Sequence, residues 1–353
     1  MRKLRTDKPF FIVVALLVFF GILIFFSASM GLWTRENINP IDLAFKQIFI
    51  GLFLGIITAN FTSRIPYKLW KIWSPYLFFL SVLATLLVFI PGIGFSHGGA
   101  TRWISLGGMS IQPSEFLKIG FIIYLAALLS KHKNKILNWR EGVAPFFILI
   151  CITGAIFVKQ PDIDMLVILF FTGVCMLVVA RAQWKHIFLI MIIAVLTFGA
   201  LIALKPYIKE RMLTFLNPER DSQGASYQIQ QSLIAIGSGG VFGRGFGQSV
   251  QKFGALPEPI GDSVFSVAAE EFGFIGATIL ILCFAFFLLR GLKLASHSPD
   301  SFGRLLASGI VILIVSQSFL NIGAMMGLLP LSGIPLLFVS HGGTALLVTL
   351  AEV

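Results

Sequence analysis

The sequence predicts an all-α integral membrane protein with about ten transmembrane helices and a large extracytoplasmic loop between the seventh and the eighth. Of its 353 residues, 57% are hydrophobic and only 12% are charged, and the mean hydropathy is +0.91. Soluble domains carry roughly 25% charged residues. The apolar residues also fall into runs of about the 20 residues that a bilayer-spanning helix needs. We therefore expect residues 1–353 to form a single polytopic membrane domain.

Ten apolar stretches are candidates for these spans, and the fifth is short for a full crossing. They cover residues 10–30, 43–62, 73–91, 114–130, 143–158, 163–180, 186–204, 263–289, 305–328 and 333–351.

The basic residues indicate the orientation of the bundle. If the N-terminus is cytoplasmic, the inner loops hold more than half of the 27 Lys and Arg residues, as expected for short cytoplasmic loops. The net charge of +11 is then explained by topology and by contact with anionic lipid. A nucleic-acid partner is not predicted.

Two segments on the predicted outer side are unusual. Residues 205–262 are the longest polar stretch, rich in Gly, Gln and charge, which makes a passive connector improbable. Residues 92–113 are Gly-rich and only weakly polar, which suggests a re-entrant chain at the bilayer edge, with Pro113 opening the next helix.

Several charged residues lie at the predicted span ends. Glu115 and Lys118 are three residues apart and share one helix face, as a structural ion pair or as part of a site. Arg102 lies just upstream, and together with Lys118 it favours a cationic cluster of the kind that holds phosphate.

Two further polar residues have two interpretations each. Asp162, followed by Asp164, lies between the fifth and sixth spans, where it could cap the next helix or take part in a site. His341 falls within the tenth span as a packing residue or a proton-active group.

Asp262 immediately precedes the eighth span. It is either an N-cap or a carboxylate that accepts a proton from a substrate hydroxyl, in the company of Lys252, Glu258, Glu270 and Glu271. Spacing does not distinguish the two. An outward-facing charged site at the bilayer surface suits a substrate with a lipid tail and a phosphate-bearing head, and it fits an enzyme or a transporter equally well.

The motifs resemble those of the SEDS family (shape, elongation, division, sporulation), whose members include FtsW, RodA and SpoVE. The resemblance extends over nearly the whole chain, and the stretches 227–233 and 247–252 are most similar to the FtsW and SpoVE branch. The motifs that carry it occupy residues 99–104, 112–118, 160–162, 217–221, 227–233, 237–240, 256–258, 270–276 and 329–335.

The resemblance implies a peptidoglycan glycosyltransferase that polymerises lipid II at the outer face of the bacterial cytoplasmic membrane, for cell division or shape. Asp262 matches the family's catalytic aspartate, although the His-Thr pair that usually precedes it is absent. The implied partners are a class B penicillin-binding protein and other divisome or elongasome membrane proteins.

The implied chemistry assigns roles to these residues. Asp262 would act as general base, or would hold a divalent cation, Mg²⁺ or Mn²⁺, because an ordinary Asp pKa of about 3.9 is low for a base at neutral pH. No other cofactor is expected, and no set of metal ligands is identified. The residues expected to bind substrate or diphosphate are Arg102, Lys118, Glu115, Lys252 and Lys46. Further candidates are Glu258, Asp162, Asp164, Gln112, Glu270 and Glu271. The alternatives are a lipid II flippase and a non-catalytic scaffold for the penicillin-binding protein.

Overall fold

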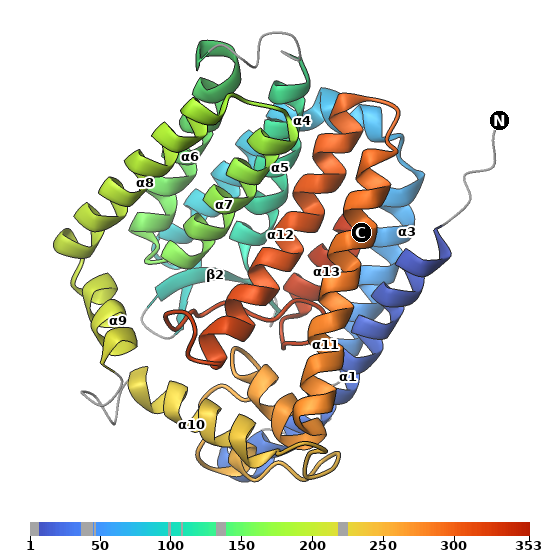
Figure 1. Ribbon diagram of the computed structural model, residues 1–353, viewed down its shortest axis with the longest axis vertical. Helices are drawn as coiled ribbons and strands as arrows, with labels where there is room; N and C mark the ends of the chain where they lie inside the picture. Colours follow the sequence, from blue (N-terminus) through green and yellow to red (C-terminus); the bar gives the residue numbers. More distant parts are fainter. Residues whose placement is uncertain are drawn as a thin grey trace. The chain divides into compact units, whose positions relative to one another are not determined.

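A computed structural model describes residues 7–36, 45, 47–97, 100–106, 109–131, 139–217 and 225–353 (Figure 1). These residues form two compact units. Unit 1 comprises residues 1–49, 194–290 and 317–343, and unit 2 comprises residues 50–193, 291–316 and 344–353. Each unit is therefore assembled from segments far apart in the sequence. Lys46 and most of the 217–221 motif lie outside the described residues.

The predicted all-α membrane fold is confirmed. Six described helices are long and apolar enough to cross a membrane: α1 (Lys8–Glu36), α4 (Tyr67–Leu86), α5 (Pro113–Lys131), α8 (Trp184–Leu204), α11 (Val264–Ser296) and α12 (Ser301–Met325). Three more are apolar but shorter: α6 (Ala144–Lys159), α7 (Ile163–Val179) and α13 (Gly343–Glu352). The figure of ten spans stays a prediction.

In unit 1, α1 supports the chain that leads to Asp262. Phe25, Ala28 and Leu32 recur at helical spacing on one face of α1 and pack against Leu256, Ile260 and Val267. At its start, α1 is joined to α11 by a pair of contacts from the Arg290 guanidinium to the Asp7 carboxylate, at 2.9 and 2.6 Å.

The polar stretch 205–262 is helical over much of its length. It contains α9 (Pro206–Leu216), α10 (Ala225–Ser238) and the short 3₁₀ helix η4 (Gln251–Phe253). The proline that opens α9 occupies a position where the missing N–H costs nothing. Where it is described, the expected loop thus contains several short helices.

A bend at Gly273 divides α11. This residue has φ +66°, and a Cβ there would lie 2.2 Å from the Gly243 amide nitrogen, so only glycine fits. The bend frees backbone groups that pair with residues 239–247, which we call the glycine loop. The pairs are Arg244 N with Glu270 O at 3.0 Å, Gly245 N with Glu271 O at 3.0 Å, Phe274 N with Gly240 O at 2.9 Å and Ile275 N with Val241 O at 3.2 Å.

Two predicted spans differ from the structure. The tenth was expected over 333–351, but residues 333–342 are not helical, and only α13 forms. Gly333, Pro335 and the Gly342-Gly343 pair oppose a helix there. The second, expected over 43–62, consists where described of a π-helix, η1 (Gln47–Phe53), followed by α3 (Leu54–Arg64).

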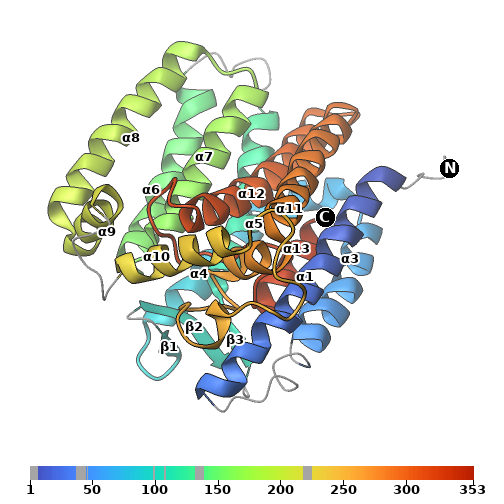
Figure 2. The ribbon, with the colours of Figure 1, turned by 60° about the horizontal axis from the view of Figure 1, so that its bottom comes forward.

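In unit 2, the expected re-entrant segment is a small antiparallel sheet. Its strands lie side by side in the order β1 (Gly94–His97), β2 (Ala100–Leu106) and β3 (Met109–Ile111) (Figure 2). Ile104 is paired with Gly94 on one side and with Ile111 on the other. Strand pairing satisfies the backbone groups of a segment too rich in glycine for a stable helix. β3 pairs with β2, which carries Arg102, and leads directly into α5, which carries Glu115.

Candidate functional site

Asp262 lies half-buried in unit 1, two residues before α11 begins at Val264. Its backbone carbonyl accepts a hydrogen bond from Asn321 Nδ2 at 2.9 Å. The two preceding carbonyls are held as well: Ser340 Oγ donates to Gly261 O at 2.7 Å, and His341 N donates to Ile260 O at 2.6 Å. Three consecutive carbonyls are thus fixed by the chain between residues 321 and 341, and this fixes the backbone that carries the carboxylate.

Asn321 and Ser340 are the residues that the sequence analysis missed. Asn321 is fully buried and also donates to Ile334 O at 2.8 Å, while Ser340 Oγ accepts from Leu336 N at 2.8 Å. A signal was present, because Gln317 and Asn321 are polar residues four apart in an apolar helix, a costly arrangement in a membrane. The ring of His341 stacks on Phe25, with centroids 5.6 Å apart, in agreement with the packing interpretation.

We expect Asn321→Leu to lower kcat for the reaction that Asp262 serves, by between about tenfold and a hundredfold, because small displacements of a reacting group are costly. The substrate KM should change little. The matched control is Gln317→Leu, because Gln317 lies four residues away on α12, is equally buried and donates to Pro335 O at 3.3 Å. Asn321→Leu removes a donor from two carbonyls, those of Asp262 and Ile334, and Gln317→Leu removes one from Pro335, at about 1–3 kcal/mol of stability for each carbonyl. Equal losses of kcat in the two variants would show that the role of Asn321 is only structural.

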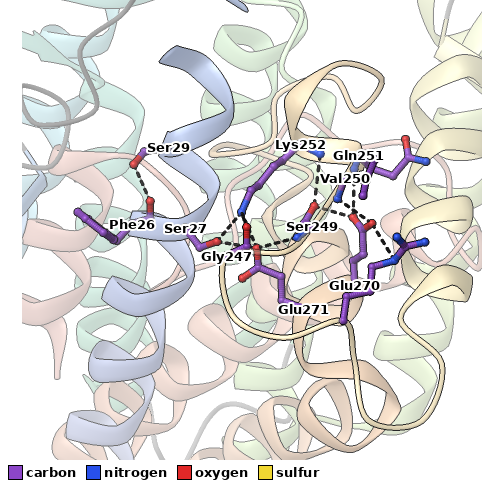
Figure 3. A network of polar contacts seen from close by, with 11 residues as sticks. Phe26, Ser27, Ser29, Gly247, Ser249, Val250, Gln251, Lys252, Glu270 and Glu271 are labelled. Carbon is purple, nitrogen blue, oxygen red and sulfur yellow. Dashed lines mark hydrogen bonds and ion pairs between the residues drawn. The ribbon is translucent and has the colours of Figure 1, made fainter. Parts of the chain in front are cut away.

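Lys252 and Glu271 form a buried ion pair in unit 1 (Figure 3). Both side chains are fully buried, and Lys252 Nζ is 2.7 Å from Glu271 Oε1. The ammonium also donates to Ser27 Oγ at 2.8 Å and to Gly247 O at 2.9 Å, and Ser27 Oγ donates to Glu271 Oε1 at 2.5 Å. The three hydrogens of the Lys252 ammonium therefore already have acceptors. The expectation that Lys252 binds diphosphate is not supported. We infer instead that Lys252 holds residues 247–252 against α1.

Close approach of the backbones makes this burial possible. A Cβ at Gly31 of α1 would lie 2.3 Å from Lys252 O. Glycine is therefore required at this position for α1 to reach η4.

Glu270 fixes the neighbouring turn (Figure 3). Its carboxylate accepts from Ser249 Oγ at 2.6 Å, from Val250 N at 3.0 Å and from Gln251 N at 3.3 Å. Arg244 Nε lies 3.4 Å away. Glu270 and Glu271, which are site candidates from the sequence, thus hold residues 249–252 in place. The segment that leads to Asp262 is therefore held at both ends, at residues 249–252 and at residues 260–262.

Glu258 is exposed and lies in a turn. Its φ is +46°, and its carbonyl accepts from the amides of Gly261 and Ser263, each at 3.1 Å. The turn brings the chain back toward α11. Glu258 stays a candidate because its carboxylate is accessible.

Unit 2 carries the second set of predicted residues. Glu115 and Lys118 are both buried at the start of α5, with Lys118 Nζ 2.9 Å from Glu115 Oε2. Arg102 of β2 donates through Nη2 to Pro161 O, and its Nε lies 3.6 Å from Asp162 Oδ2. Three buried atoms of this set have no hydrogen-bond partner among the described residues: Arg102 Nε, Glu115 Oε1 and Asp162 Oδ2. Such groups in a native protein call for an explanation, and a polar ligand is one.

Asp162 is also an electrostatic outlier. It precedes α7, and burial raises its pKa to about 6, against the lowering effect of the Arg102 guanidinium and with smaller raising effects from Asp164 and Glu115. The fold therefore disfavours the charged form of Asp162. Raised carboxyl pKa values of this kind are common at functional sites.

The raised pKa of Asp162 predicts a pH dependence of stability. Because the folded-state pKa lies above the unfolded value of 3.8, the stabilising contribution of this group is complete below pH 3.8 and is lost as the pH rises through about 6. Asp162→Asn should reduce the difference in thermal stability between pH 4.5 and 7. Melting curves of both proteins in the same detergent measure this, and an unchanged difference would show that Asp162 has an ordinary pKa.

The remaining candidates are less central. Asp164 lies in the first turn of α7 and is half-buried, and the Gln112 carbonyl accepts from the Glu115 amide at 3.1 Å. Glu352, which the sequence analysis did not select, lies within electrostatic reach of Lys118 and Glu115.

A divalent cation at Asp262 stays a prediction. Within the described ranges, no group of three or more His, Cys, Asp or Glu side chains is placed to hold a metal ion. A cation held by one carboxylate together with substrate phosphates would need no such group.

Comparison with known proteins reveals full-length relatives. A family model described as the FtsW/RodA/SpoVE cell cycle protein matches residues 7–353. Stage V sporulation protein E of Bacillus subtilis is 36% identical over 352 residues, which cover 100% of this chain and 96% of the relative. A protein of Trichlorobacter lovleyi named "Probable peptidoglycan glycosyltransferase FtsW" is also 36% identical, over 100% of this chain and 92% of the relative.

Two solved structures share the fold. One belongs to a study described as "Structural coordination of polymerization and crosslinking by a peptidoglycan synthase complex", with a TM-score of 0.82, 27% identity, and coverage of 99% of this chain and 96% of that one. The other is the rod shape determining protein RodA of Thermus thermophilus, with a TM-score of 0.71, 25% identity, and coverage of 100% and 95%.

Proposed function

The chain belongs to the FtsW/RodA/SpoVE family of cell cycle proteins, and on that premise we propose that it is a peptidoglycan glycosyltransferase that polymerises lipid II. In this proposal the protein lies in the bacterial cytoplasmic membrane with its N-terminus in the cytoplasm. Its active site faces outward, for division or shape. The observation that carries the proposal is the half-buried Asp262 on a backbone fastened at three consecutive carbonyls.

The proposed reaction joins two disaccharide units. The 4-hydroxyl of one attacks the anomeric carbon of the other, while the bond from that carbon to the diphosphate oxygen breaks. The electron pair leaves with the polyprenyl diphosphate, and Asp262 accepts the hydroxyl proton as general base. The anchored backbone would hold the carboxylate within reach of that hydroxyl without reorganisation.

The residues of unit 2 would bind the leaving group. Arg102 and Lys118 supply positive charge for a diphosphate, and Glu115 orients Lys118 at 2.9 Å. Arg102 Nε lies 3.6 Å from Asp162 Oδ2, so a phosphate oxygen would compete with that carboxylate for this donor. Lys252 has no part in this proposal.

We also propose a class B penicillin-binding protein as the partner that cross-links the strands. One similar structure belongs to a peptidoglycan synthase complex. Other membrane proteins of the divisome or elongasome would join the same assembly.

The deciding experiment is polymerisation of purified lipid II by the reconstituted protein, alone and with the partner carrying an inactivated transpeptidase, with and without Mg²⁺ or Mn²⁺. Glycan strands resolved on a gel support the enzyme. Absence of strands in every arm, with folded protein, would overturn it. Transbilayer movement of labelled lipid II in the same vesicles would then identify a flippase, and retained partner binding alone would identify a scaffold.

A further inference from the structure

An open apolar groove in unit 1 is not used by the proposed reaction. It lies between α1 and the two arms of the bent α11, and the glycine loop contributes Phe242 to its mouth. The groove has a volume of about 240 Å³. Its lining residues are all apolar or glycine: Phe20, Ile24, Phe242, Ala268, Phe272, Ile275, Gly276, Ile279 and Leu280.

The depth of the groove follows from α1. The apolar span of this helix runs from Lys8 to Leu32, and Phe20 lies at its middle. The hydrocarbon core of a bilayer is about as thick as such a span is long. Phe20, and therefore the groove that it lines, lies at the level of lipid tails.

The glycine loop is fixed at the same depth as the groove. Four backbone hydrogen bonds across the bend at Gly273 hold it. Phe242 is nevertheless 82% exposed and Val241 is 57% exposed. Exposed apolar side chains on a loop fastened at membrane depth require an apolar medium around them.

We propose that the groove binds one acyl chain of a bilayer phospholipid, which holds the glycine loop in the membrane. The groove is continuous with the lipid-facing side of α11, where Phe274 is 70% and Leu282 is 60% exposed. Ile275 and Ile279 in its wall are themselves 43% and 46% exposed. A chain is therefore held from one side only, as suits a lipid of the surrounding bilayer. The proposal does not depend on the glycosyltransferase assignment.

Photocrosslinking tests this directly. The full chain is reconstituted in phosphatidylethanolamine–phosphatidylglycerol vesicles that contain a trace of phosphatidylcholine with a diazirine on its acyl chain. After illumination, labelled peptides are mapped by mass spectrometry. The surrounding bilayer labels the exposed Phe19 and Phe26 of α1, so labelling is resolved to single residues. We expect strong labelling of Ile24, which lines the groove and is otherwise buried.

Two tryptophan variants of α11 separate the groove from general lipid contact. Ile279→Trp fills the groove and should reduce labelling of Ile24 several-fold. Leu282→Trp adds the same side chain on the same helix outside the groove lining and should leave it unchanged. Thermal melts of both variants confirm that each is folded.

Three results would overturn the proposal. Equal labelling in the two variants would mean ordinary bilayer contact. Labelling of α11 without labelling of Ile24 would mean that the groove is closed to lipid and open to a protein helix. Displacement of the label by a polyprenyl phosphate, but not by excess phospholipid, would assign the groove to an isoprenoid chain.

Discussion

Asp262→Asn is expected to abolish glycan polymerisation while leaving the protein folded. The amide has nearly the same shape as the carboxylate, but it cannot take up the hydroxyl proton. The anchoring bonds from Asn321, Ser340 and His341 all reach backbone carbonyls, so the side-chain change leaves them in place. Loss of a general base costs about a hundredfold to ten-thousandfold in rate. The measurement is the initial rate of strand formation from lipid II.

The control for this variant is Glu258→Gln. Glu258 is the exposed carboxylate of the same turn, and its structural role uses its carbonyl oxygen. We expect Glu258→Gln to retain most of the activity. If Asp262→Asn polymerises lipid II at the wild-type rate, Asp262 is not the base, and Glu258 and Asp164 become the next carboxylates to test.

Lys252→Met is expected to lower stability by about 3–5 kcal/mol, because it leaves the buried Glu271 carboxylate without its cation. Ser27 Oγ would be the remaining side-chain donor to that carboxylate. A change of this size is exceptional for one substitution and should appear as a large fall in melting temperature and in folded protein after purification.

A double variant and an exposed lysine make this result specific. Lys252→Met combined with Glu271→Gln removes both charges and should recover a substantial part of the stability, since isosteric neutral pairs are often tolerated. Lys293→Met, at an exposed lysine of α11, should have almost no effect. A Lys252→Met protein that melts like wild type yet binds lipid II weakly would contradict our reassignment and restore the diphosphate role predicted from the sequence.

The sequence alone determined the class of protein and pointed to candidate site residues. Low charge, long apolar runs and the distribution of Lys and Arg are local features that report directly on a membrane environment. The order of the motifs predicted the family, and the comparisons confirm it. Arg102, Glu115, Lys118 and Asp162 were each identified as notable because charge near an apolar span is costly wherever the rest of the chain lies.

The tertiary structure decided what each charge does. Lys252 looked like a ligand for phosphate, but its partner Ser27 is 225 residues away in the sequence, and no local pattern predicts that contact. The same holds for the bonds that fix Asp262, since Asn321 and Ser340 reach their carbonyl partners across 59 and 79 residues. The bend at Gly273 and the non-helical chain at 333–342 interrupt apolar runs that hydropathy reads as continuous helices. Apolar character reports the solvent around a segment, whereas the course of the backbone and the pairing of buried charges depend on which distant groups pack against them.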